Sequence, residues 1–142
     1  MADTLKGRCL CGQVEWVASA PPLWSAHCHC ESCRRAASAG FVSWIGFARN
    51  SVKWSGERKF YRSSKKVKRC FCPICGTPLG FETTVLPQQV HLYAVSLDNP
   101  EFYQASGHLY WSEKLNWVHI EDSLPKHEKG LQAATKEGKN IL

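Results

Sequence analysis

Phe71-Cys72-Pro73-Ile74-Cys75-Gly76 is the stretch of sequence that decides the fold. The two residues between Cys72 and Cys75 let one tight turn aim both sulfur atoms at a single metal ion. Gly76 allows the backbone a positive φ immediately after the second cysteine. Such a pair supplies only two of the four ligands of a tetrahedral zinc site, so two further thiolates must come from elsewhere in the chain.

Cys9-Leu10-Cys11 is the natural partner of this pair. In an extended segment, residues i and i+2 point to the same face, so the two sulfurs can approach one ion together. Joining the two pairs would clamp together segments that lie far apart in the chain. The redox alternative is a thioredoxin-like dithiol at Cys72 and Cys75, a motif that should open a helix. Gly76-Thr77-Pro78 cannot open a good helix, so we favour the metal site.

A second group, Cys28, Cys30 and Cys33, places three thiols within six residues. Three thiolates can bind one zinc ion and leave its fourth position to water or substrate, which is the arrangement of a catalytic site. A thiol substrate that binds there would lose its proton. The alternative is a closed and inert site, with Cys70 or a neighbouring histidine as fourth ligand. Cys70 as a bystander thiol is equally compatible with the spacing.

Length and composition indicate one domain of 142 residues with a modest core. No apolar run approaches the ~18 residues of a membrane span. The N-terminus lacks the basic and apolar regions of a signal peptide. We therefore expect a cytoplasmic protein without a membrane partner, whose cysteines are reduced rather than paired in disulfides.

The formal charge of +6 falls to about +3 if seven thiolates and two divalent ions are counted. Basic residues cluster at Arg34-Arg35 and across residues 65–69. A solvated rim is the simplest interpretation, and an anionic small ligand or nucleic acid is the functional one. No nucleic-acid motif accompanies the cluster, so we expect a small-molecule substrate and no nucleic acid. The sequence does not indicate an oligomeric state.

The fold class that the sequence predicts is mainly β, with short antiparallel strands and at most one or two short helices. Residues 13–17, 41–47 and 89–95 alternate or are rich in aromatic and branched side chains, as strands are. Residues 51–54 and 58–62 are expected to form a hairpin. Only residues 31–37 favour a short helix. We place the domain at residues 5–126 and a polar tail at residues 127–142.

The cysteine motifs resemble those of the glutathione-dependent formaldehyde-activating (GFA) family, also called the CENP-V/GFA domain. The resemblance covers about residues 5–126. Its specific stretches are residues 7–12, 28–35 and 71–79, and its softer ones are residues 96–100, 107–110, Trp117 and 122–125.

The resemblance implies a zinc-stabilised, coiled β architecture of the Mss-four type with two zinc ions per chain. It also implies a carbon–sulfur lyase reaction of the S-hydroxymethylglutathione synthase type, which joins formaldehyde to glutathione. It implies the ligand sets Cys9, Cys11, Cys72 and Cys75 for a structural zinc, and Cys28, Cys30 and Cys33 for a catalytic zinc.

Three hypotheses about function follow. The leading one is an enzyme that acts on a small thiol or a thiol–aldehyde adduct, with a zinc-bound thiolate as nucleophile. Three thiolate ligands make zinc a weak Lewis acid, which suits a soft sulfur nucleophile better than hydroxide. The alternatives are an enzyme of the same fold acting on another carbonyl or imine, and a non-catalytic zinc module that binds a protein partner. The last predicts a closed second site.

Several other side chains have expected roles around these centres. Arg34, Arg35 or Lys68 could pair with a substrate carboxylate, or be plain surface charges. His108 is a candidate proton carrier or a structural histidine, and His27 and His29 are expected beside the ligands rather than among them. The aromatic residues expected in the core are Trp44, Phe47, Trp111 and Trp117.

Overall fold

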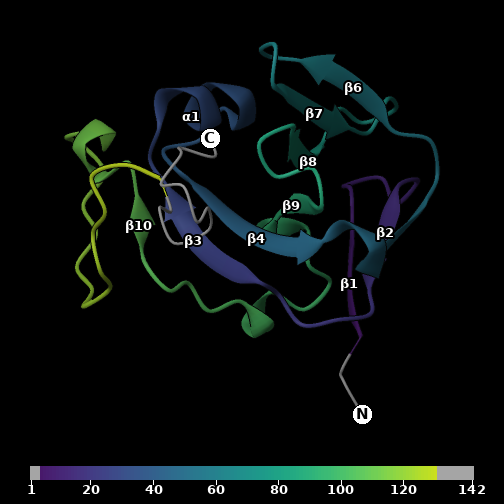
Figure 1. Cartoon of the computed structure of the whole chain (residues 1–142), viewed down its shortest axis with the longest axis horizontal. Coiled ribbons are helices and arrows are strands. Elements are labelled where there is room, and N and C mark those ends of the chain that lie inside the picture. The colour runs from purple at the N-terminus through teal and green to yellow at the C-terminus, as the bar shows by residue number, and fades with distance from the viewer. Residues whose placement is uncertain (1–3, 131–142) are drawn as a thin grey trace.

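The computed structural model describes residues 4–130, and the predicted fold class is confirmed: these residues are mainly β. A small sheet has the order β1-β2-β5, and a large sheet has the order β10-β3-β4-β9-β8-β7-β6. Figure 1 shows β3 and β4 side by side through the middle of the molecule, with β10 beyond β3 and the β6–β7 pair on the far side. Within residues 4–130, neighbouring strands pair antiparallel except β10 with β3, which is parallel.

The bounds of the elements follow the chain. The small sheet contains β1 (Leu5–Arg8), β2 (Glu15–Ala18) and β5 (Val52–Ser55). The large sheet contains β3 (Trp24–Cys28), β4 (Val42–Ala48), β6 (Lys59–Arg62), β7 (Val67–Phe71), β8 (Pro78–Thr83), β9 (Gln89–Tyr93) and β10 (His108–Leu109). The helices are α1 (Glu31–Ala37) and the short 3₁₀ segments Arg49–Ser51, Ala94–Ser96, Pro100–Phe102 and Trp111–Glu113.

The expected helix and strands are present. The helix has the predicted bounds, and strands expected at residues 13–17, 41–47 and 89–95 appear as β2, β4 and β9 with ends that differ by at most two residues. The helix ends where Ser38 adopts a left-handed φ of 52°. Within residues 4–130, no helix has the length and apolar character needed to cross a membrane.

The predicted hairpin is wrong in its pairing. Both strands exist, but β5 pairs with β2 in the small sheet, and β6 pairs with β7 in the large one. The β2–β5 register sets Trp16 opposite Trp54, and Trp16 is almost fully buried. Gly56, with a φ of 85°, then packs against the backbone of Gln13, so the chain leaves the small sheet after β5. Burial of Trp16 therefore determines which strand pairs with β5, and the turn residues after β5 do not.

The apolar core is continuous with the cysteine clusters. One group of buried residues joins β2 to β4 and β9, with Trp16 and Phe47 in tilted contact. A second group surrounds Cys28, Cys30 and Cys33, and a third surrounds the other cysteines. The polar segment after residue 126 begins on the domain, since the backbone N–H of Trp111 donates to the carbonyl of His127. The remainder of the expected tail, residues 131–142, lies outside the described residues.

His91, in β9, is a buried titratable residue among aromatic rings. Its ring stacks on Phe81 with centroids 5.4 Å apart and meets the edge of Trp24 at 4.7 Å. Its Nε2 lies 3.0 Å from Oε1 of Gln89, which also accepts from the indole N–H of Trp24, so Nε2 is the donor. Burial lowers the pKa of His91 to about 3. The native state therefore keeps this imidazole neutral far below pH 6.5.

We expect the free energy of unfolding to decrease as the pH drops below about 6.5. In that range His91 becomes protonated in the unfolded chain but stays neutral in the native state. The contribution is up to about 1.4 kcal/mol per pH unit until the pH nears the native pKa. His91→Phe keeps the ring contacts and removes the proton. Urea unfolding at pH 7.5 and 5.5, with zinc present, should show a smaller pH dependence in the variant. An unchanged pH dependence would contradict the assignment.

Candidate metal centres

The structure gathers Cys9, Cys11, Cys72 and Cys75 into one cluster, here called the four-cysteine cluster, whose sulfur atoms all lie within 4.8 Å of one another. The Cys9 and Cys11 sulfurs are 3.6 Å apart, and those of Cys11 and Cys72 are 3.8 Å apart. Zn–S bonds of about 2.3 Å in a tetrahedron place sulfurs about 3.8 Å apart. None of the chain's cysteines forms a disulfide. The donor set and its spacing therefore fit a four-coordinate zinc ion.

Backbone N–H groups point at these sulfurs and favour thiolates. The Cys72 sulfur accepts from the amides of Ile74 and Cys75 at 3.4 and 3.5 Å, a turn that Gly76 completes with a φ of 77°. Hydrogen bonds from Thr77 lower the pKa of the Cys75 thiol to about 5. The Thr77 hydroxyl also accepts from the amide of Leu10 at 3.1 Å. One side chain thus ties the N-terminal pair to the later one.

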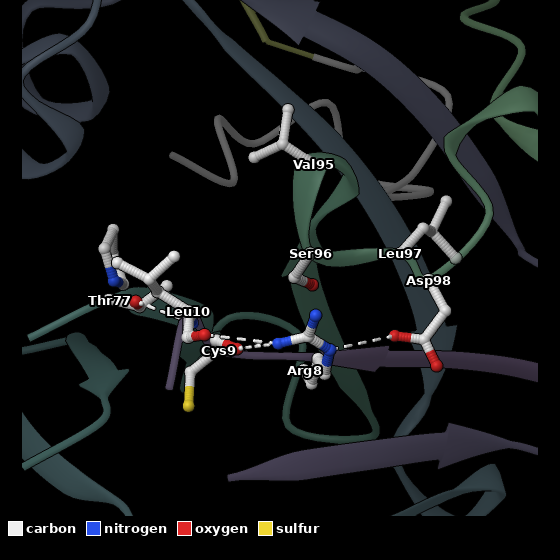
Figure 2. Close-up of a pocket in the computed structure, with 9 residues that line it drawn as sticks. Arg8, Cys9, Leu10, Thr77, Val95, Ser96, Leu97 and Asp98 are labelled. Atoms are coloured by element: carbon white, nitrogen blue, oxygen red, sulfur yellow. Dashed lines mark hydrogen bonds and ion pairs between the residues drawn. The ribbon is translucent and has the colours of Figure 1, made fainter. Parts of the chain in front are cut away.

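A cleft of about 460 Å³ lies beside the four-cysteine cluster, and contacts of Arg8 join several of its lining residues. Figure 2 shows the Arg8 guanidinium pointing between Asp98 on one side and the carbonyls of Cys9 and Leu10 on the other. Both carbonyls lie 3.2 Å from Nη1 of Arg8. The contacts of this arginine brace the loop that carries the N-terminal cysteine pair.

The second set, here called the three-cysteine cluster, contains Cys28, Cys30 and Cys33. Cys28 ends β3, Cys30 precedes α1 as its N-cap, and Cys33 lies in the first turn of α1. The Cys30 sulfur accepts from the amide of Cys33 at 3.3 Å. All three side chains are buried. Within residues 4–130, no fourth His, Cys, Asp or Glu ligand atom joins the group.

The thiols of the three-cysteine cluster differ in their ease of ionisation. Hydrogen bonds with Cys28 and Cys30 lower the pKa of Cys33 to about 3, and the charge of Arg69 acts in the same direction. Burial raises the pKa of Cys28. These buried thiols cannot all lose their protons without a nearby positive charge. A divalent cation would supply that charge and allow all three to bind it as thiolates.

Three histidines make hydrogen bonds next to this cluster without joining it. Nε2 of His29 lies 2.9 Å from Nδ1 of His108, whose Nε2 lies 2.8 Å from a carboxylate oxygen of Asp122. Nδ1 of His27 lies 2.8 Å from the Ser43 hydroxyl. Both His29 and His108 are fully buried, so the chain of hydrogen bonds fixes the segment between Cys28 and Cys30. The three histidines could be named from the sequence. Their spacing does not show that His29 and His108, 79 positions apart, contact each other.

Cys70 lies in neither cluster. Its buried sulfur is 4.0 Å from Nη1 of Arg58, and burial raises the pKa of its thiol to about 11. Its side chain packs with Leu79 in the core beside the four-cysteine cluster. Cys70 is therefore placed as a neutral thiol beside the metal centres.

We expect Cys70→Ser to retain the zinc content of the wild type because its sulfur is outside both clusters. The change should cost about 1–3 kcal/mol of stability for burying a hydroxyl in place of a thiol. Zinc per chain after gel filtration, measured by elemental analysis, is the test. Loss of about one zinc per chain would make Cys70 a ligand.

A pocket of about 530 Å³ lies between the two clusters. Its walls are α1, at Ser32 and Arg35, and β7, at Arg69 and Cys70. Its lining also reaches Gly76, next to Cys75 of the four-cysteine cluster, and Ser32 precedes Cys33 of the three-cysteine cluster. None of the seven clustered cysteines is among the described residues that line the pocket, but Tyr93, which packs in the core with Cys28, Cys30 and Cys33, does line it.

The basic residues named from the sequence are engaged elsewhere or lie at the rim. Arg34 donates to the carbonyl of His29 at 3.0 Å, and Lys68 pairs with Glu82 at 3.3 Å. Arg35 lines the pocket but is exposed and pairs with Glu31. Arg69 is the buried cation among the residues that line the pocket. The sequence places it only within the basic cluster at residues 65–69, and spacing alone does not show that this residue of β7 is buried.

The expected aromatic core is found only in part. Trp44 and Phe47 are fully buried. Trp111 is half-buried and packs edge-on against His29 and His108. Trp117 is 66% exposed, so the prediction of a core role for it is wrong; it lines a surface cleft with Arg34 and Arg35.

Comparison with known proteins gives a consistent picture. Residues 4–113 match the family described as glutathione-dependent formaldehyde-activating enzyme. A protein of Schizosaccharomyces pombe named as an uncharacterized lyase is 34% identical over 79 residues, which are 56% of this chain and 58% of that protein. The chain thus aligns with little more than half of that relative's length.

A solved structure resembles the chain in fold. The crystal structure of a Rhodobacter sphaeroides protein matches with a TM-score of 0.55, covering 86% of this chain and 98% of that one. Its sequence identity is 18%, so the likeness concerns the fold alone.

Proposed function

Because the chain belongs to the family of the glutathione-dependent formaldehyde-activating enzyme, we propose that it is a zinc-dependent lyase acting on a small thiol or a thiol–aldehyde adduct. The observation that carries the proposal is the three-cysteine cluster, which offers three buried sulfurs and no fourth ligand atom within residues 4–130. Three protein ligands are the mark of a catalytic zinc site, and four thiolates that of a structural one. The name of the fission-yeast relative supports the same class of enzyme.

In this proposal Cys28, Cys30 and Cys33 hold the catalytic zinc, and the four-cysteine cluster holds the structural zinc. A zinc ion held by three thiolates would lower the pKa of a thiol that binds it. The family's description supports glutathione and formaldehyde as reactants. The thiol sulfur forms a bond to the aldehyde carbon, and the thiol proton ends on the former carbonyl oxygen. The product is a hydroxymethyl thioether, and the reverse path splits it.

The protein's own residues prepare the site for that chemistry. The cluster is buried among Trp44, Tyr93 and Leu109, which pack around it. Arg69, in the adjacent pocket, lies close enough for its charge to act on Cys33. The Asp122–His108–His29 hydrogen bonds keep the ligand segment rigid. The substrate would arrive through the pocket between α1 and β7.

The structure gives no support to a closed second site with Cys70 as fourth ligand, since Cys70 joins neither cluster. The non-catalytic module predicted a closed second site with Cys70 or a histidine as fourth ligand, and within residues 4–130 no histidine ligand atom joins the three-cysteine cluster either. The enzyme proposal is therefore the one we develop.

The test is the rate of exchange between formaldehyde and its glutathione adduct. Zinc-loaded protein should accelerate the reaction of glutathione with formaldehyde above its spontaneous rate, as followed by NMR exchange spectroscopy. Cys30→Ser protein, which lacks one of the three proposed zinc ligands, is the matched inactive control. A rate equal to the spontaneous one, in protein that retains its zinc, would rule out these reactants.

A further inference from the structure

The β6–β7 pair carries a second hollow, here called the basic cleft, of about 260 Å³. Arg62 of β6 and Lys68 of β7 line it, and it reaches across to Glu82 of β8. Tyr61 and Arg69, the chain neighbours of Arg62 and Lys68, line the pocket beside α1 instead. Successive side chains of a strand point to opposite faces of the sheet. The basic cleft therefore lies on the other face of these strands from the pocket through which the proposed substrate arrives.

The basic cleft has more positive charges than its own acid can balance. Glu82 is buried, accepts a hydrogen bond from Nη1 of Arg49, and has Oε2 3.3 Å from Nζ of Lys68. One carboxylate thus holds two cations at the cleft. Arg62 and Lys66 also line it, and neither forms an ion pair within residues 4–130. Four cations against one carboxylate leave the described lining with a net charge of +3.

The strand register sets two of these cations directly opposite each other. Arg62 lies opposite Lys68 in the β6–β7 pair, and Lys68 lies opposite Glu82 in the β7–β8 pair. Like charges directly opposite on neighbouring strands destabilise a sheet. Nη1 of Arg62 donates to the carbonyl of Lys65 at 3.2 Å, which satisfies a donor but does not neutralise the charge. The fold alone gives no reason to gather these cations, whereas an anion in the cleft would offset their repulsion.

The volume and charge of the basic cleft favour a phosphate group as that anion. Pockets that enclose whole small molecules measure about 300–1,000 Å³, so a cleft of about 260 Å³ suits a head group. A phosphate monoester carries a charge of about −1.5 to −2 at pH 7 and three strong acceptor oxygens. A carboxylate offers a single charge and two oxygens. The phosphate group therefore matches a lining of charge +3 better.

A nucleic-acid strand fits this face less well than a small molecule does. Proteins that bind single strands stack the bases on aromatic side chains beside a basic groove. Phe60, two residues before Arg62 on β6, is partly exposed, but its ring already lies 5.1 Å from the guanidinium of Arg58 and 4.7 Å from Nζ of Lys68. Two cations thus occupy the ring that a base would need.

We propose that the basic cleft binds the phosphate group of a small molecule through Arg62, Lys66 and Lys68. Glu82 and Arg49 hold the inner side of the site, since the buried carboxylate fixes the ends of Arg49 and Lys68. The site goes beyond the proposed function and does not depend on it, because it uses neither cysteine cluster and lies on the other face of the strands.

The experiment compares phosphate groups with a carboxylate of similar size. Zinc-loaded wild-type protein is titrated calorimetrically with methyl phosphate, inorganic phosphate and acetate, with no thiol or aldehyde present. The salt concentration is about 0.1 M, at which charges more than about 10 Å apart are largely screened. We expect one site per chain for either phosphate, and acetate to bind at least about tenfold more weakly. The tighter of the two phosphates identifies the source as an ester or as the free ion. Acetate binding as tightly as methyl phosphate would overturn the proposal.

Two double variants with the same loss of charge test the residues. Arg62→Gln with Lys66→Gln removes two exposed cations of the basic cleft and should weaken methyl phosphate binding at least about tenfold. Its melting temperature without ligand should equal or exceed that of the wild type, because the repulsion opposite Lys68 is gone. Lys53→Gln with Lys59→Gln is the control, since both residues are exposed and outside the cleft. The control should bind within about twofold of the wild type.

Three further results would overturn the proposal. Equal losses in the two double variants would show attraction to the overall charge of the protein rather than a site. Phosphate binding that is unchanged in the Arg62→Gln, Lys66→Gln protein would place the anion elsewhere, the three-cysteine cluster with its zinc included. A twelve-nucleotide oligothymidylate that binds at least about tenfold more tightly than methyl phosphate, and loses affinity equally in both double variants, would make this face a nucleic-acid surface.

The outcomes also separate the basic cleft from the proposed function. Loss of the phosphate site would leave the thiol and aldehyde chemistry standing, because neither reactant is present in the titration. Phosphate binding that depends on Arg62 and Lys66, in protein that does not accelerate the reaction of glutathione with formaldehyde, would support the cleft and contradict the proposed function.

Discussion

Cys72→Ser should unfold the protein at room temperature. Cys72 is fully buried, and its sulfur lies 3.8 Å from that of Cys11 across 61 positions of the chain. Structural zinc sites contribute about 10–16 kcal/mol of apparent binding free energy, which is comparable to or larger than the 5–15 kcal/mol stability of a typical domain. A weakened site supplies much less of this free energy, so the segment that carries Cys9 and Cys11 is expected to separate from the rest of the domain. Circular dichroism melts with zinc present should show no cooperative transition near that of the wild type.

Cys70→Ser is the matched control for this prediction. It lies two positions away, is 2% exposed, and makes the same chemical change at a sulfur outside both clusters. It measures the cost of a buried hydroxyl without the loss of a ligand. If Cys72→Ser melts within a few degrees of Cys70→Ser, the four-cysteine cluster does not hold the fold together.

Cys30→Ser should abolish activity while the protein stays folded. Loss of a group beyond the ligands costs 10–100-fold in metal affinity or activity, so loss of a ligand should cost at least about 100-fold. Serine is also a favoured N-cap, so it can replace the sulfur that accepts from the amide of Cys33. Helix α1 should therefore still begin at Glu31. The measurements are thermal melts and the glutathione–formaldehyde exchange rate on the same sample.

The comparison of Cys30→Ser with Cys72→Ser is what separates a catalytic from a structural centre. We expect a large loss of activity with a modest fall in melting temperature for Cys30→Ser, and loss of the fold for Cys72→Ser. Equal destabilisation of the two variants would show that the division of roles is wrong.

Much of the fold could be predicted because it depends on local patterns. The bounds of α1 agree with the prediction at residues 31–37, between Cys30 and Ser38, and three expected strands lie within two residues of their predicted positions. The grouping of the cysteines followed from their spacing, since Cys-x-Cys and Cys-x-x-Cys each direct two sulfurs to one side. Such features need only neighbouring residues.

The remainder depends on contacts that spacing does not encode. The hairpin prediction failed because β5 pairs with β2, where the half-buried Trp54 lies opposite the buried Trp16, 38 positions away, rather than with β6. The positions of Arg69 and Tyr93 in the lining of one pocket were not predicted, because the sequence places Arg69 in a basic cluster and Tyr93 in an apolar strand. Only the sheet order β9-β8-β7 brings their side chains to one pocket.

We propose that the chain holds one closed and one open zinc site. Zinc K-edge X-ray absorption on the purified protein, with zinc counted on the same sample, tests it most directly. Seven thiolates shared by two ions give an average of about 3.5 sulfurs at about 2.3 Å, with the remaining coordination from a light atom. We predict about two zinc ions per chain and that average. Four sulfurs per zinc with two ions bound, or one ion per chain, would contradict the account.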